Sequence, residues 1–177
     1  MKKHLLPGLL MVAMGWRTPA LAAHLRVTGI VTSKITAAPV PDALVRIYKD
    51  GVKQHILHTG PNGRYDVVLD NNADYVIRFS LPGQVTKCFS VDTHGPAWEG
   101  DNTIKEVFVE MTLFDVMPDM DLSFFDLPMG MARFDPMTGY LTWDEEYDER
   151  IRPEVQRLMD AYERILLERT VVARNYP

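Results

Sequence analysis

Hydrophobic and polar residues alternate through most of residues 25–113, in short runs separated by turn residues. In the first run Val27 and Val31 share one face, while Arg26 and Thr28 lie on the other. A period of two is typical of a β-strand that is buried on one side. Seven such runs follow one another with turn signals between them, which predicts a mainly β protein, a seven-stranded antiparallel sandwich.

Two local signals make this prediction more specific. Asp50-Gly51 separates two runs and predicts a two-residue hairpin, because both positions tolerate a positive φ. After the Pro61-Asn62-Gly63 turn, Tyr65 falls on the inward face of its run, so we expect it to anchor the core.

The pattern changes in residues 116–177, where we expect an irregular segment, a small hairpin around Pro136–Gly139 and a C-terminal amphipathic helix interrupted at Pro153. The helix carries one apolar stripe, which must be buried against some surface. That surface is either the protein's own sandwich or another chain, and the length of the helix favours another chain. The stripe consists of Val155, Leu158, Met159, Tyr162, Ile165 and Leu166.

Residues 1–23 have the composition of a signal peptide. Lys2 and Lys3 precede a short apolar stretch, and small residues follow at Ala20–Ala23. The stretch is too short to cross a membrane as a permanent helix, which needs about 20 residues. We expect cleavage near Ala22 or Ala23, a periplasmic or secreted location, and no integral membrane span in the mature chain.

Composition narrows the classes of partner. The net charge is −5, which argues against nucleic acid as a partner. Cys88 is the single cysteine, so no internal disulfide is possible. His55 and His58 are three residues apart, which places them on opposite faces of a strand and disfavours a metal pair. We expect no metal site and no cofactor.

The order of motifs in residues 24–115 resembles the carboxypeptidase regulatory-like domain, a transthyretin-like β-sandwich. The similarity rests on a strand with a central Gly29, on Pro41-x-Ala43-x-Val45, and on Thr59-x-x-x-Gly63-x-Tyr65. The tail around residues 124–147 resembles that of small exported envelope proteins with this domain. Gly60 and Gln84 depart from the domain's pattern and affect its loops. The resemblance implies an accessory domain without a fixed activity.

Enzymatic alternatives find little support in the residues. A Gly-x-Ser-x-Gly motif is missing from the sequence, and a metallocarboxypeptidase would need a separate catalytic domain. The transthyretin-like hydrolases need a C-terminal Tyr-Arg-Gly-Ser, whereas this chain ends Arg174-Asn175-Tyr176-Pro177. Intradiol dioxygenases use a related sandwich with two Tyr and two His on iron, and the spacing of these residues here does not match. We therefore expect no catalytic residues.

The resulting hypothesis is an exported, non-catalytic binding or scaffolding protein that contacts an envelope protein or a second copy of itself. The alternative is a carbohydrate-binding accessory module, in which exposed aromatic side chains stack on a sugar. The candidate binding residues are Trp98, Trp143, Leu158, Tyr162 and Ile165.

Overall fold

The computed structural model describes residues 24–95, 104–135 and 140–175. Within these ranges the chain forms nine strands, one short 3-10 helix and one long α-helix. The elements are β1 (Leu25–Ser33), β2 (Leu44–Lys49), β3 (Val52–His58), β4 (Arg64–Leu69), β5 (Asp74–Ser80), β6 (Lys87–Asp92), β7 (Lys105–Leu113), η1 (Ser123–Asp126), β8 (Pro128–Asp135), β9 (Tyr140–Trp143) and α1 (Glu145–Asn175).

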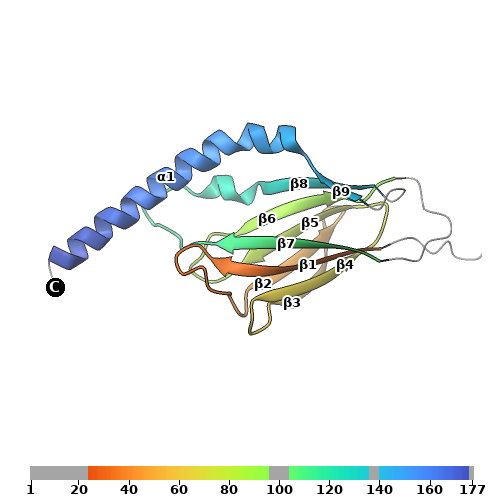
Figure 1. Cartoon of the computed structure of the whole chain (residues 1–177), viewed down its shortest axis with the longest axis horizontal. Helices are drawn as coiled ribbons and strands as arrows, with labels where there is room; N and C mark the ends of the chain where they lie inside the picture. The colour runs from red at the N-terminus through yellow and green to blue at the C-terminus, as the bar shows by residue number, and fades with distance from the viewer. Residues whose placement is uncertain (1–23, 96–103, 136–139, 176–177) are drawn as a thin grey trace, which may run out of the picture.

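The strands form two layers (Figure 1), so the predicted sandwich is confirmed. One sheet has the order β4-β1-β7 and the other has the order β3-β2-β5-β6-β8-β9. The buried sides of both sheets meet in one core that includes Val27, Val45, Phe79 and Phe89. Burial alternates along the strands as the sequence pattern predicts.

The prediction of seven antiparallel strands is wrong in both number and direction. β1 pairs with β7 in parallel, and β6 pairs with β8 in parallel, so both sheets are mixed. The predicted C-terminal hairpin is not a separate extension, because β8 and β9 join the larger sheet beside β6. Its turn, Pro136–Gly139, lies outside the described residues. β7 returns the chain to the end of the sandwich where β6 begins, since Val85 N–H donates to the Phe114 carbonyl there. Segment 114–127 then crosses to the larger sheet at this end, so β8 can run parallel to β6.

The Asp50–Gly51 hairpin forms as predicted between β2 and β3. Asp50 has a φ of 49° and Gly51 a φ of 76°, the left-handed conformation that such a turn requires at both positions. Tyr65 also lies where the alternation placed it, 4% exposed on the inner face of β4.

Helix α1 runs beside β8 and η1 and extends past the end of the strands (Figure 1). It continues through Pro153 as one element, although an interruption was predicted there. Its apolar stripe packs against the segment that follows β7, in a second core separate from that of the sandwich. This second core contains Val85, Phe114, Met117, Leu122, Phe125, Leu158 and Tyr162. Among the described residues, no helix has the length and apolar character needed to cross a membrane.

Candidate functional site

The strongest candidate site is a groove where the edge of the smaller sheet meets β8 and the start of α1. We call it the β7–β8 groove; its volume is about 490 Å³. That volume is in the usual range for a small-molecule site, about 300–1,000 Å³. The groove is lined by Lys87 and Phe89 of β6, by Val109–Thr112 of β7, by Met129–Met131 of β8, and by Trp143, Asp144, Glu145 and Asp148.

Trp143 forms one wall of the groove because Gly130 on β8 leaves room for its ring. A Cβ atom on Gly130 would lie 2.9 Å from Cζ3 of the Trp143 ring, so only glycine lets the indole pack so closely on the β8 backbone. The ring also makes an edge contact with Phe89, with ring centroids 6.0 Å apart. Trp143 nevertheless stays 41% exposed. The groove therefore presents a supported aromatic surface.

Carboxylates dominate the charge of the groove. Four acidic residues contribute to its lining: Glu110, Asp144, Glu145 and Asp148. Asp144 caps helix α1, since its Oδ1 accepts a hydrogen bond of 2.8 Å from the Tyr147 N–H. Asp148 pairs with Arg152, and Glu110 Oε1 accepts a hydrogen bond of 2.9 Å from Thr32. Lys87 is the only basic residue among the described residues of the lining, and these residues carry an acidic excess.

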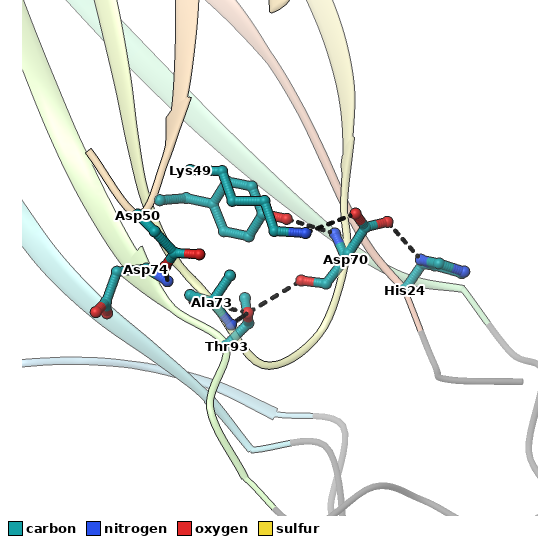
Figure 2. A network of polar contacts seen from close by, with 8 residues as sticks. His24, Lys49, Asp50, Asp70, Ala73, Asp74 and Thr93 are labelled. Atoms are coloured by element: carbon teal, nitrogen blue, oxygen red, sulfur yellow. Dashed lines mark hydrogen bonds and ion pairs between the residues drawn. The ribbon is translucent and has the colours of Figure 1, made fainter. Parts of the chain in front are cut away.

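A second candidate lies at the end of the sandwich, where β5 begins and β6 ends. Ligand atoms of Asp74, Asp92 and His94 all lie within 4.8 Å of one another, a spacing that would suit a divalent metal ion. Figure 2 shows the polar network around this end of the sheets, in which Asp70 contacts both His24 and Lys49.

The contacts within this second cluster already satisfy its members. Asp92 Oδ1 accepts hydrogen bonds of 2.8 Å from both the backbone N–H and the Nδ1 of His94. Partial burial opposes ionisation of Asp92, but these hydrogen bonds outweigh it and lower the pKa of the carboxyl group. Asp74 lies 3.8 Å from the same ring nitrogen. An exposed ion-pair cluster explains the arrangement, so the β7–β8 groove is the better candidate.

The candidate residues named from the sequence lie in different places. Trp143 lies in the groove, and Trp98 lies outside the described residues. Leu158 and Tyr162 are 5% and 0% exposed and pack inside their own chain, and Ile165 packs beside them. These three side chains of α1 therefore contact the protein's own second core. The sequence had left open whether they pack within their own chain or against another chain. A protein partner elsewhere on the chain stays a prediction.

Sequence reasoning missed most of the groove. Lys87 and Gly130 belong to no recognisable motif. They line the groove only because β8 lies beside β6, and local sequence patterns do not show this pairing. Asp148 was visible only as one of several acidic residues at a helix start, where such residues are common. The aromatic character of Trp143 was the one available signal.

Comparison with protein-family models and with curated proteins found no match to this chain. The resemblance to the carboxypeptidase regulatory-like domain therefore stays a prediction.

Several solved structures are similar over part of the chain. The 3-chlorocatechol 1,2-dioxygenase of Rhodococcus opacus 1CP is 12% identical with a TM-score of 0.42, over 54% of this chain and 61% of that chain. Catechol 1,2-dioxygenase from Acinetobacter sp. ADP1 is 15% identical with a TM-score of 0.41, over 60% of this chain and 57% of that chain. The Bacillus anthracis TIE protein is 14% identical with a TM-score of 0.41, over 53% of this chain and 18% of that chain. This chain spans less than two thirds of the length of each.

These neighbours contradict two predictions: that the chain is an exported non-catalytic binding or scaffolding protein, with a carbohydrate-binding module as the alternative, and that it is not an enzyme. At these identities, and with TM-scores below 0.5, the likeness assigns no activity to this chain.

Proposed function

We propose that the protein binds a small organic cation with a flat apolar body in the β7–β8 groove. The observation that carries this proposal is the Trp143 ring, supported by Gly130 and Phe89 and surrounded by acidic residues. An indole face is the most favourable aromatic surface for a cation. Nearby carboxylates attract the same charge, and Val109, Met111 and Met129 provide apolar contact for the body of the ligand.

The setting that we propose is the bacterial envelope, with a sandwich of the transthyretin-like kind. The basic start at Lys2 and Lys3, the apolar stretch after it and the small residues at Ala20–Ala23 support export. The Pro41-x-Ala43-x-Val45 element supports the transthyretin-like assignment, because Ala43 and Val45 are both buried in the core.

Export predicts a processed N-terminus. Protein isolated from its native host is expected to begin near Ala23 or His24 when its N-terminal sequence is determined, because signal peptidase cuts after small residues. Cytosolic protein that retains Met1 would contradict the proposed location and leave the groove unaffected.

The proposed ligand class can be tested with a matched pair of probes. Benzyltrimethylammonium and neopentylbenzene have the same shape and differ by one positive charge. We expect calorimetric titration to show binding of the cation, and binding at least about tenfold weaker for the neutral isostere, since a desolvated cation–π contact contributes about 2 kcal/mol. Equal affinity for both probes would contradict the proposed role of charge.

Variants of the groove separate specific binding from general surface effects. Trp143→Leu is expected to weaken binding of benzyltrimethylammonium by about tenfold, because it removes the aromatic face. Tyr140→Leu is the matched control, since Tyr140 lies on the same strand, is exposed and does not line the groove. Asp148→Asn and its neighbour Glu149→Gln form a second pair, in which only Asp148 lines the groove. Equal losses within either pair would place the binding site elsewhere.

A further inference from the structure

Lys87 has an unusual environment at one end of the β7–β8 groove. It begins β6 in the larger sheet, and its Nζ donates a hydrogen bond of 2.9 Å to the carbonyl oxygen of Thr112 on β7, in the smaller sheet. The side chain therefore links an inner strand of the larger sheet to the edge strand of the smaller one. Both Lys87 and Thr112 contribute to the lining of the groove.

The surroundings of the Lys87 amine are mostly apolar. Its Nζ lies 5.8 Å from the ring centroid of Phe114 and 5.8 Å from that of Phe125. Among the described residues, no carboxylate oxygen lies within 4.0 Å of the amine to form an ion pair, although Glu110, Asp144, Glu145 and Asp148 line the same groove. The faces of the two rings and the Thr112 carbonyl favour the ammonium form, but no carboxylate among the described residues adds to them, and burial opposes them.

Burial and the charge of a neighbouring lysine both lower the pKa of Lys87. Burial has the larger effect and the nearby ammonium group of Lys34 the smaller one, and together they lower the pKa of Lys87 to about 8. Lys34 itself pairs with Glu163 of α1 at 3.1 Å, so its charge is fixed in position. With this pKa about a tenth of the Lys87 amine is in the neutral, nucleophilic form at pH 7, and the fraction rises toward pH 8.

We propose that Lys87 is a covalent attachment site, at which its ε-amine forms a reversible imine with an aldehyde or ketone whose apolar body occupies the groove. This inference rests on the proposed function and adds the reactive group of the ligand. The Nζ lone pair attacks the carbonyl carbon, and a proton moves from nitrogen to oxygen to give a carbinolamine. Loss of one water molecule then forms the carbon–nitrogen double bond, with no oxidant or reductant required.

Reductive trapping tests the proposal on the full chain. The probe is 4-(trimethylammonio)benzaldehyde, which carries the proposed cation and an aldehyde, and cyanoborohydride supplies the hydride that converts an imine into a stable secondary amine. Peptide mass spectrometry then measures the adduct at each lysine. At pH 7.5 we expect labelling of Lys87 to exceed that of the exposed Lys53 by about tenfold or more, because far more of its amine is neutral. The yield at Lys87 is expected to rise with a midpoint near pH 8.

The outcomes distinguish this inference from the proposed function. Equal labelling of Lys87 and Lys53, with benzyltrimethylammonium still bound in the calorimeter, would overturn the attachment site and leave the groove's function standing. Failure of benzyltrimethylammonium to bind would overturn the function itself. Lys87→Arg keeps the charge and the hydrogen-bond donors but removes the nucleophilic amine. It is expected to abolish the preferential adduct, and a preferential adduct that persists in this variant would contradict the assignment.

Discussion

Replacing Tyr65 by alanine is expected to lower the free energy of unfolding by about 3–5 kcal/mol, the usual cost of truncating a large buried aromatic side chain. Tyr65 is almost fully buried, and its ring makes an edge contact with Phe79 at a centroid distance of 4.9 Å. Its hydroxyl donates a hydrogen bond of 2.8 Å to the carbonyl oxygen of Val109, which links the outer strands of the smaller sheet. Urea denaturation of the wild type and the variant measures the difference.

Tyr65→Phe is the matched control for the ring. It keeps the apolar contacts and loses only the hydrogen bond to Val109, so we expect a cost of about 1 kcal/mol. A loss below about 1 kcal/mol for Tyr65→Ala would show that the side chain is not part of the core.

Replacing Tyr162 by alanine is also expected to lower the free energy of unfolding by about 3–5 kcal/mol. Tyr162 is fully buried, and its ring makes an edge contact with Phe114 at 4.9 Å, which joins α1 to the end of β7. Because the helix belongs to the second core, the variant should show this loss in the same cooperative transition as the sandwich. A loss confined to the helical signal, with the sandwich unchanged, would contradict this placement.

Tyr162→Phe differs from Tyr65→Phe because it removes a hydroxyl group that has no hydrogen bond to lose within the described part of the chain. The Tyr162 hydroxyl is buried near the backbone of Asp115 and has no hydrogen-bond partner of acceptable geometry among the described residues. Removing it should therefore change the free energy of unfolding by less than about 1 kcal/mol, or raise it. Leu167→Ala tests the exposed side of the helix, where Leu167 is 68% exposed, and is expected to change stability by about 0.5 kcal/mol or less.

The local features of the sandwich could be predicted from the sequence because they depend on neighbouring residues. Alternation of side chains identifies strands, and Asp50-Gly51 and Tyr65 each follow from a short pattern with a clear physical reason. The order of strands depends on distant contacts. The parallel pairing of β6 with β8 follows from how segment 114–127 crosses the sandwich, and no periodicity in that segment shows it.

The candidate site also combines local features, which the sequence shows, with contacts between distant residues, which it does not show. Trp143 could be named from its residue type, but its support by Gly130 requires β8 and β9 to be adjacent in space. Lys87 looked like an ordinary polar residue at the start of a strand. Its hydrogen bond to Thr112 joins residues of different sheets, so only the folded chain shows it. The apolar stripe of α1 showed that the helix must be covered, but its spacing does not identify the covering surface.

Fluorescence of Trp143 alone shows whether the β7–β8 groove binds an organic cation at this side chain. The chain has three tryptophans, so the Trp16→Phe, Trp98→Phe double variant leaves Trp143 as the only indole. Benzyltrimethylammonium is expected to change the Trp143 emission in a saturable way, with the same dissociation constant that calorimetry gives. Calorimetric binding without any change in Trp143 emission, or no binding at all, would contradict the claim.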